Sequence, residues 1–331
     1  MAVLVTGVAG FIGSHVARAL LARGETVLGI DNFSDYYDPV LKFARLKPLR
    51  EDRAFTFLEA DIADRDAMLA LPGRYPGLDR IVHLAAQPGV RHSQVDPYVY
   101  VQTNVMGHLV MLELARRCEG LKHFVYASSS SVYGGNRKQP FAVADRVDEP
   151  ISLYASTKRS DELMSFSYSH LHKLSATGLR FFTVYGPWGR PDQAPMLFTR
   201  AILAGEPIRL FNHGRMQRDF TYVDDIAEGV ARVLAKPPMA EDGNAPHAIY
   251  NIGNHRAVEL TEFVDTLERL LGRRAIREMR EMQPGDVPAT YASIDRLHAA
   301  VEFAPHTALT DGLARFVAWY RDYYGIAASP G

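Results

Sequence analysis

The sequence predicts an α/β fold in which a doubly wound parallel sheet is followed by a smaller C-terminal α/β domain. Three observations support this prediction. The chain opens with an apolar stretch at 2–6, a glycine-rich turn at 7–13 and a helical pattern at 14–23. Strand and helix patterns then alternate to about residue 180, as in a parallel sheet covered by helices on both faces. Beyond Gly186 the alternation gives way to irregular chain rich in proline and glycine.

The first strand, turn and helix have the pattern of a Rossmann-type nucleotide-binding unit. Gly7, Gly10 and Gly13 are spaced so that the backbone can turn tightly and approach a pyrophosphate without an intervening Cβ. The helix that follows offers unpaired N–H groups and the positive end of its dipole to that anion. We expect these glycines, with Phe11 and Ile12 between them, to contact a dinucleotide.

The second strand, expected at 26–30, ends in Asp31, eighteen residues beyond Gly13. An acid at this point can accept hydrogen bonds from the ribose hydroxyls of adenosine. Asn32 follows it, and no arginine stands beside it to hold a 2′-phosphate. The sequence therefore favours NAD over NADP, the alternative for Asp31 being a solvated carboxylate in a turn.

The later strands of the sheet are expected at 55–61, 81–85, 124–127 and 176–182, with helices near 64–71, 98–117 and 154–173. Ligands of such a sheet bind beyond the carboxyl ends of its strands. Polar groups that fall at these ends include Ser128–Ser131 and Thr183. Further residues that we expect to contact the cofactor are Asp61, Ile62, Leu84, Ala85, Ala86 and Asn104.

Two domains are expected. Residues 1–180 would form the NAD-binding domain, and residues 181–331 mainly a substrate-binding domain, with some segments returning to the sheet. Strand patterns in the second part lie at 208–210 and 250–252, and helical patterns near 195–204, 224–236, 260–271 and 308–323. Residues 237–246 are expected to form a loop, and the tail from Ala327 to fray.

Composition narrows the class of protein. The formal net charge of the 331 residues is −1 and no Lys/Arg cluster appears, so we expect no nucleic-acid partner. The single cysteine, Cys118, cannot form an internal disulfide, which fits a reducing compartment. No leader pattern and no apolar stretch of about 20 residues is present. We therefore expect a cytoplasmic protein that does not bind a membrane. The histidines lack partners at metal spacing, and we expect no metal.

A candidate catalytic pair opens the helix expected at 154–173. Tyr154 and Lys158 are four residues apart, which places them on one face of a helix. A lysine ammonium beside a phenol favours the phenolate, and such a tyrosine can remove a hydroxyl proton while hydride leaves the same carbon. On its own, this spacing is more often that of an exposed helix pair. The dinucleotide turn and the serines at 128–131 favour the catalytic interpretation.

Four motifs together resemble the extended short-chain dehydrogenase/reductase family, over essentially the whole chain. They are the turn at 6–13, His83–Ala86, Ser130–Gly134 and Tyr154-x-x-x-Lys158. Residues 218–225 and 284–287 are similar to the downstream nucleotide-sugar segments of that family.

The resemblance implies a catalytic triad, a retained NAD and a UDP- or dTDP-linked sugar as substrate. Tyr154 and Lys158 supply two members of the triad, and alignment from Tyr154 makes Ser129 the third. The helices near 98–117 and 154–173 resemble the dimer interface of the family, which implies a homodimer.

Within the family, the residues before Val132 distinguish the chemistry. The 4,6-dehydratases carry an Asp-Glu pair there, and the UDP-glucuronate decarboxylases carry a Glu, whereas this chain has Ser130 and Ser131. Elimination of water needs a positioned acid and base, so a dehydratase is disfavoured. An epimerase needs only removal of hydride, rotation of the ketone and return of hydride.

Residues 31–38 and 180–192 resemble the UDP-glucuronate 4-epimerases, although residues 193–196 depart mildly from their pattern. UDP-glucose 4-epimerases usually carry Asn at the position of Thr183. The resemblance implies that the substrate contacts include Arg91, Arg190, Arg218, Gln283 and Asp286. A solvated loop charge for Arg190 and a structural ion pair for Arg91 remain open.

Carboxylate chemistry would give the serines a role. Oxidising C4 of a uronate creates a β-keto acid, which loses CO₂ easily unless its carboxylate is held. Ser128, Ser129, Ser130 and Thr183 could hold it through hydrogen bonds worth about 1–3 kcal/mol each, while at least one serine of 128–131 is expected to be structural.

The leading hypothesis is therefore NAD-dependent 4-epimerisation of UDP-glucuronate to UDP-galacturonate. The alternatives are a UDP-glucuronate decarboxylase, a UDP-glucose 4-epimerase and, outside enzymes, an NAD-binding sensor. Intact Tyr154 and Lys158 argue against the sensor, because a sensor has no need of the pair.

Overall fold

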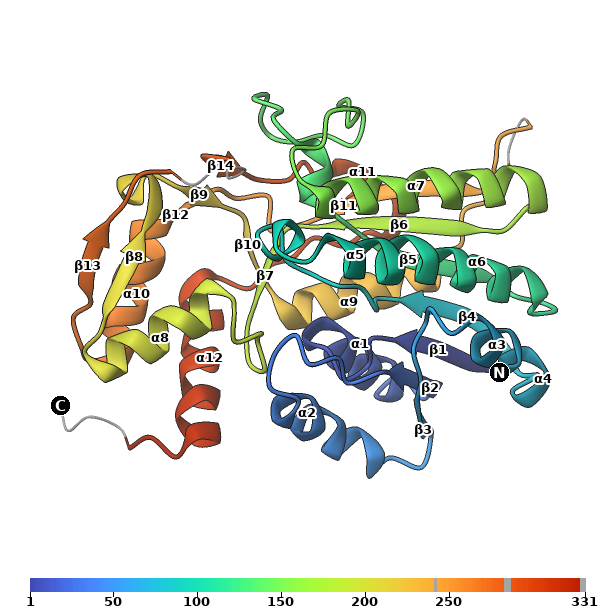
Figure 1. The fold of residues 1–331 in the computed structure, drawn as a ribbon, viewed down its shortest axis with the longest axis horizontal. Coiled ribbons are helices and arrows are strands. Elements are labelled where there is room, and N and C mark those ends of the chain that lie inside the picture. The colour runs from blue at the N-terminus through green and yellow to red at the C-terminus, as the bar shows by residue number, and fades with distance from the viewer. Residues whose placement is uncertain (241–242, 283–286, 328–331) are drawn as a thin grey trace.

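The computed structural model describes residues 1–240, 243–282 and 287–327. Its centre is a seven-stranded sheet in the order β11-β6-β5-β4-β1-β2-β3 (Figure 1), in which all neighbouring strands are parallel. The strands are β1 (Ala2–Thr6), β2 (Thr26–Asp31), β3 (Phe55–Glu59), β4 (Leu78–His83), β5 (His123–Ser129), β6 (Ala176–Phe181) and β11 (His247–Ile252). The chain moves outward from β1 to β3 and then returns past β1 to β4. This topology confirms the predicted doubly wound sheet, whose ligands bind where the strand order reverses.

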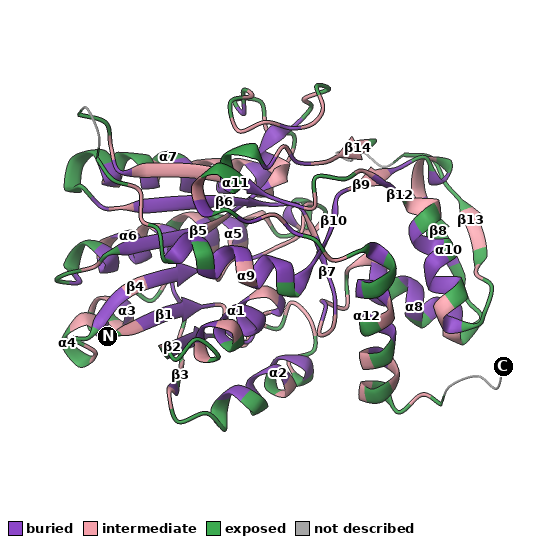
Figure 2. Cartoon of the chain, turned by 180° about the vertical axis from the view of Figure 1, so that it is seen from behind, coloured by how far each residue is buried: buried purple, intermediate pink, exposed green. Residues whose placement is uncertain are grey.

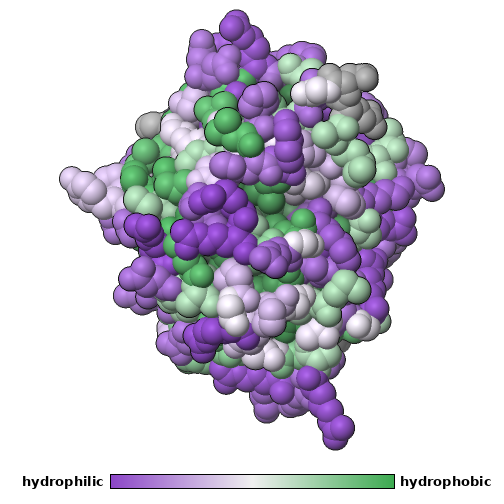
Figure 3. Space-filling view, turned by 90° about the vertical axis from the view of Figure 1, so that its right-hand side faces the viewer, coloured by the Kyte–Doolittle hydropathy of each residue, from purple (hydrophilic) through white to green (hydrophobic). Residues whose placement is uncertain are grey.

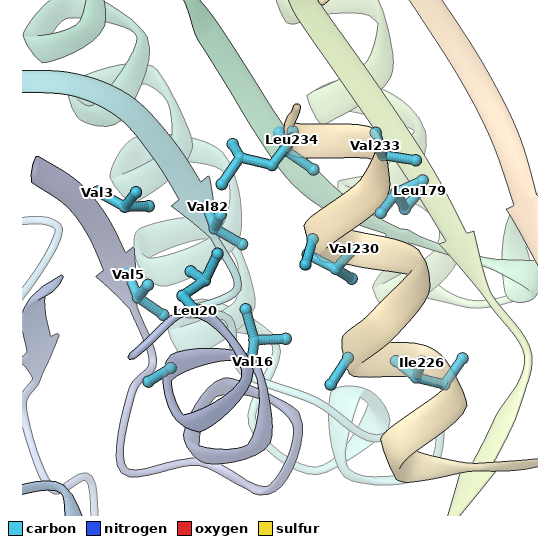
Figure 4. Close-up of a cluster of buried hydrophobic side chains, with 14 of the residues drawn as sticks. Val3, Val5, Val16, Leu20, Val82, Leu179, Ile226, Val230, Val233 and Leu234 are labelled. Carbon is cyan, nitrogen blue, oxygen red and sulfur yellow. The ribbon is translucent and has the colours of Figure 1, made fainter. Parts of the chain in front are cut away.

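Different helices cover the two faces of the sheet, because side chains alternate between the faces along each strand. Val3 and Val5 of β1 pack in a cluster with residues of α1 (Phe11–Leu21) and α9 (Val223–Leu234) (Figure 4). Leu4, between them, joins the cluster under α3 (Arg65–Leu69), α4 (Leu71–Arg74) and α6 (Gly107–Arg117). The central strands β1, β4 and β5 are therefore mostly buried (Figure 2).

One helix of this region, α2 (Val40–Arg50), is not predicted by the sequence patterns. Its buried positions include Lys42 and Arg45 beside leucines. Two charged residues thus interrupt the apolar stripe by which an amphipathic helix is recognised.

The prediction of one helix at 98–117 is wrong. A π-helical stretch, η2 (Val101–Met106), separates α5 (Pro97–Tyr100) from α6. The stretch carries Asn104, whose side chain accepts a hydrogen bond from the backbone N–H of Gln87 at 2.7 Å and donates one to its carbonyl at 3.1 Å. A π-helical turn accommodates such a local constraint where a regular helix would not.

The C-terminal elements form a second hydrophobic cluster. Its helices are α8 (Ala194–Ala204), α10 (Leu260–Leu271) and α12 (Leu309–Tyr324). The small sheets of this part join β8 (Pro207–Leu210) to β13 (Ile276–Met279), β7 (Thr183–Tyr185) to β10 (Phe220–Tyr222), and β9 (Gln217–Arg218) to β12 (Val258–Glu259) and β14 (Ala289–Thr290). Helix α11 (Asp295–Val301) and helix α9 lie against the large sheet, and β11 pairs with β6. These are the segments that return to the sheet.

The face at the right of Figure 1 carries hydrophilic side chains with hydrophobic ones interspersed (Figure 3). Within the part of the chain that the structure describes, no helix has the length and apolar composition needed to cross a membrane. In the same part, no three side chains of His, Cys, Asp or Glu gather into a group that could hold a metal ion.

Candidate active site

A cavity of about 1030 Å³ lies at the carboxyl ends of the central strands. Sites for small molecules usually span about 300–1,000 Å³, so this cavity lies at the upper end of that range. The predicted site residues that line it are Gly7, Gly10, Phe11, Ile12, Gly13, Asp31, Asn32, Asp61, Ile62, Leu84, Ala85, Ala86, Ser128, Ser129, Ser130, Tyr154, Lys158, Thr183 and Arg190. They come from seven separate segments of the chain.

The glycine turn is packed so closely that side chains would not fit. Gly7 has a φ of +70°, and a Cβ on it would lie 2.8 Å from the backbone nitrogen of Ala85. A Cβ on Gly13 would lie 2.0 Å from the carbonyl oxygen of Gly7. Helix α1 begins after Gly10 without a side-chain cap, so its first N–H groups remain available to an anion. The turn therefore fits the pyrophosphate of a dinucleotide.

Asp31, at the end of β2, is buried rather than solvated. Its carboxylate accepts hydrogen bonds from the backbone N–H groups of Ala9, at 3.1 Å, and Phe33, at 2.9 Å. The Lys42 ammonium lies 3.7 Å away and donates to the carbonyl of Ser34. Sequence reasoning missed Lys42, because this residue lies on α2, a helix that the sequence patterns do not predict. Its ammonium partly balances the negative charge of Asp31.

Asn32 and Asp61 connect the ends of β2 and β3. The Asn32 amide donates to the Asp61 carboxylate at 2.9 Å, and the other oxygen of that carboxylate accepts from the N–H of Ala63 at 2.8 Å. Asn104, by contrast, does not line the cavity. Its amide also donates to the Thr157 hydroxyl at 3.1 Å, so its role as a cofactor contact stays a prediction.

Tyr154 and Lys158 lie in the first two turns of α7 (Leu153–His172), which begins after the capping Ser152. Both side chains line the cavity. The Tyr154 ring packs edge-on against Tyr100 with centroids 6.2 Å apart. The Lys158 ammonium donates to the Ala127 carbonyl and to the Asp161 carboxylate, each at 3.0 Å.

The serines at the end of β5 have unequal surroundings. The Ser128 hydroxyl donates to Glu162 at 2.6 Å, and Glu162 is paired with Arg180 at 2.8 and 2.9 Å. Burial raises the pKa of Glu162, but hydrogen bonds and charge from Arg180 lower it further, so the net shift is downward. The hydroxyl proton of Ser128 therefore points into a buried ion pair and away from a ligand. Sequence reasoning missed Glu162, since nothing in its local pattern indicates the partner.

Ser129 and Ser130 follow at the start of η3 (Ser130–Tyr133). Ser129 caps this turn, because its Oγ accepts the backbone N–H of Ser131 at 3.1 Å and donates to the hydroxyl of Ser131 at 3.1 Å. Ser130 lines the cavity and is half-buried.

Arg190 is neither a free loop charge nor deeply buried. Its guanidinium holds the Asp192 carboxylate through two bonds of 3.0 and 3.1 Å, and the Tyr36 hydroxyl donates to the same carboxylate at 3.1 Å. Arg45 fixes the preceding loop, donating to the Trp188 carbonyl at 2.7 and 3.0 Å. Tyr36 and Asp192 lie in the stretches 31–38 and 180–192, which resemble the UDP-glucuronate 4-epimerases. The sequence does not reveal that these two residues form a hydrogen bond.

Two further predicted substrate contacts, Arg91 and Arg218, do not line the cavity. Arg91 stacks over the ring of Phe211 at 5.0 Å, in η4 (Phe211–Gly214). Arg218, in β9, donates to the carbonyls of Gln217 and Pro288. Gln283 and Asp286 lie outside the described residues.

Comparisons with known proteins match almost the whole chain. The model of the NAD dependent epimerase/dehydratase family matches residues 3–253. Protein CapI of Staphylococcus aureus is 46% identical over 336 residues, which cover 98% of this chain and 99% of that protein. The probable UDP-glucuronate 4-epimerase of Rhizobium meliloti (strain 1021) is 47% identical over 341 residues, 98% of each chain.

A solved structure is also similar. It is the crystal structure of UDP-glucuronic acid 4-epimerase from Bacillus cereus in complex with UDP-glucuronic acid and NAD, with a TM-score of 0.89 at 32% identity over 98% of this chain and 100% of that one. Together these matches confirm the predicted family and its cofactor, NAD. The chain belongs to the NAD dependent epimerase/dehydratase family.

Proposed function

We propose that the protein is an NAD-dependent UDP-glucuronate 4-epimerase, which interconverts UDP-glucuronate and UDP-galacturonate. The observation that carries the proposal is the end of β5, where consecutive serines, and no carboxylic acid, stand beside Tyr154 and Lys158 in one cavity. The names of the relatives from Rhizobium meliloti and Bacillus cereus support the same substrate.

The catalytic groups would act on the C4 hydroxyl of the sugar. NAD, when bound, supplies reversible hydride acceptance at C4. Tyr154 takes the proton of the C4 hydroxyl. It later returns the proton to the C4 oxygen, once the configuration at C4 has been inverted. Lys158 favours the ionised phenol by its charge, and Ser129 assists the same proton transfer through its hydroxyl.

The carboxylate would be held by neutral donors and by one cation. Since the Ser128 hydroxyl is bound to Glu162, the hydroxyls of Ser130 and Thr183 become the main neutral candidates. Arg190 lines the same cavity, and it can meet a substrate carboxylate by sharing or exchanging its bond with Asp192. A held carboxylate cannot rotate into the alignment in which the β-keto acid expels CO₂.

Two rival activities predict other residues. A UDP-glucuronate decarboxylase would carry a Glu where this chain has Ser131, and a UDP-glucose 4-epimerase would carry an Asn at Thr183. A sensor that only binds NAD would not need a buried lysine directed at the cavity beside a tyrosine.

We also propose a homodimer that forms through α5, η2 and α7. These elements expose large apolar side chains, which are Tyr98, Val101, Met106, Leu163 and Phe166. The three elements pack against one another, and apolar side chains exposed in such a group are typical of interfaces. Light scattering after gel filtration should give twice the mass of one chain, and Phe166→Glu should give the single-chain mass.

The proposed activity is tested by incubating the purified protein with UDP-glucuronate and no added nucleotide. Proton NMR should reveal UDP-galacturonate approaching equilibrium with the substrate. UDP-glucose, used in parallel, should react far more slowly. A UDP-pentose as the main product would assign the decarboxylase activity instead.

A further inference from the structure

Asp161 is a buried carboxyl group that the proposed reaction does not use. It lies one turn beyond Lys158 on α7 and has no solvent exposure. One carboxylate oxygen, Oδ2, accepts from the Lys158 ammonium at 3.0 Å. The other, Oδ1, has no hydrogen-bond partner among the described residues. Buried polar atoms are rarely left unpartnered, and an exception of this kind indicates a functional role for the side chain.

The bond to Asp161 determines where Lys158 directs its remaining proton. An ammonium group has three N–H donors. The Ala127 carbonyl and Asp161 take one each, and the third remains for the cavity that Lys158 lines. Asp161 thus orients the ammonium from the side opposite to the ligands.

The other titratable groups around this pair come from four elements. Burial and the nearby charge of Lys158 lower the pKa of His83 of β4 to about 3, and burial lowers that of His108 of α6 well below its usual value, so both rings are neutral. Tyr126 of β5 is buried, and burial keeps its pKa well above the usual value. Glu162 of α7 is balanced by Arg180. Lys158 is therefore the charge that balances Asp161.

Burial raises the pKa of Asp161 to about 7, although Lys158 acts in the opposite direction. The carboxyl group therefore changes its charge within the range in which the protein would work. Ionised, it neutralises part of the positive charge of Lys158, which it contacts at 3.0 Å. Protonated, it leaves that charge whole.

We propose that Asp161 is a positioning residue that aims Lys158 at the cavity and that its charge sets how strongly Lys158 activates Tyr154. The proposal deepens the proposed function and rests on it for the role of Tyr154 as the base. Two variants separate the two parts of the role. Asp161→Asn keeps an oxygen that can accept from Lys158 but carries no charge. Asp161→Ala removes both the oxygen and the charge.

The experiment measures kcat and KM for UDP-glucuronate across the pH range for the unaltered protein, both variants and Ser160→Ala. Asp161→Asn should move the acid limb of the kcat profile to lower pH by about one unit, since the carboxylate that Lys158 contacts no longer offsets the positive charge of Lys158. Asp161→Ala should lower kcat about tenfold or more at every pH, with KM little changed. Ser160→Ala is the matched control on the same helix, since its hydroxyl donates to the carbonyl of Ser156, and its profile should not move.

A second readout needs no substrate. The near-ultraviolet absorbance of ionised tyrosine is titrated for each protein and for the same protein carrying Tyr154→Phe, and the difference isolates Tyr154. Asp161→Asn should shift this difference curve to lower pH. The proposal is overturned if, in Asp161→Asn, the acid limb of the kcat profile and the Tyr154 difference curve stay in place or move to higher pH. If the unaltered protein does not convert UDP-glucuronate, the proposed function fails, whereas the tyrosine titration still decides the role of Asp161. Circular dichroism identifies a variant that does not fold, and Asp161→Ser then replaces Asp161→Ala.

Discussion

The cofactor half and the sugar half of the cavity are built in different ways. The cofactor half is mainly backbone, since the turn at 7–13 has no room for Cβ atoms and Asp31 fixes it through the N–H of Ala9. The sugar half depends on side chains joined over long stretches of sequence, such as Glu162 with Arg180 and Tyr36 with Asp192. The difference teaches that the turn expected to hold the cofactor is a property of local chain geometry, whereas in the proposed reaction the fate of the sugar would depend on paired side chains.

Gly13→Ala is expected to have the largest effect, because it breaks the cofactor half. The added Cβ would lie 2.0 Å from the Gly7 carbonyl oxygen, so the turn must open. The unaltered protein should release NAD when it is denatured and should need no added cofactor. The variant should release none and should have no measurable turnover. Gly73→Ala, at a glycine with nothing near a new Cβ, is the control, and full retention of NAD by Gly13→Ala would contradict the account.

Tyr154→Phe should break the sugar half alone. Turnover should fall by about 100- to 10,000-fold, the usual contribution of a positioned acid or base, while the retained NAD stays at the level of the unaltered protein. Lys158→Met should also be severe. Steady-state kinetics and nucleotide analysis on the same samples give both quantities. A loss of only a few-fold in kcat would place the base elsewhere.

Substitution of Ser130 and of Ser129 should give ratios of pentose to epimer that differ by about tenfold. Ser130→Ala should raise the fraction of UDP-4-keto-pentose, because a freed carboxylate can rotate and leave as CO₂. A change of about 1.4 kcal/mol is enough for a tenfold shift in the ratio of products. Ser129→Ala should instead slow epimerisation with little new product. Mass spectrometry of the mixture separates the two results, and the role of the cluster is refuted if neither variant, nor Thr183→Ala, forms the pentose.

A smaller effect is expected from the double variant Thr183→Asn with Arg190→Ala. Both residues line the cavity, and we expect them to contact the sugar and not the cofactor, so kcat/KM should fall several-fold more for UDP-glucuronate than for UDP-glucose. Rates with the two sugars, measured side by side, test this directly. Equal losses would mean that the residues position any nucleotide sugar and do not recognise the carboxylate.

The same contrast explains what the sequence could predict. The turn at 7–13, Asp31 and the Tyr154–Lys158 pair are local patterns whose spacing carries the chemistry, so they are visible without a fold. Helix α2 escaped because Lys42 and Arg45 are buried in place of apolar residues. The π-helical stretch within the helix predicted at 98–117 was not predicted, because it accompanies a hydrogen bond between Asn104 and the backbone of Gln87, outside the local sequence pattern.

The sugar half was predicted as a set of residues but not as a network. Four serines in a row look equivalent in a sequence. Only the fold reveals that Ser128 donates to Glu162 while Ser129 donates to Ser131. The partners of Arg190 and Lys158 were missed for the same reason, since Asp192 and Asp161 have no pattern that marks them as pairs.

The most direct test follows a deuterium atom placed at C4 of UDP-glucuronate through the reaction, with no nucleotide added. If one retained NAD removes hydride from C4 and returns it to the other face, the UDP-galacturonate that forms should keep its deuterium at C4, in ordinary water. Product that carries protium at C4 would contradict return of the same hydride, and a UDP-pentose formed in place of UDP-galacturonate would contradict epimerisation.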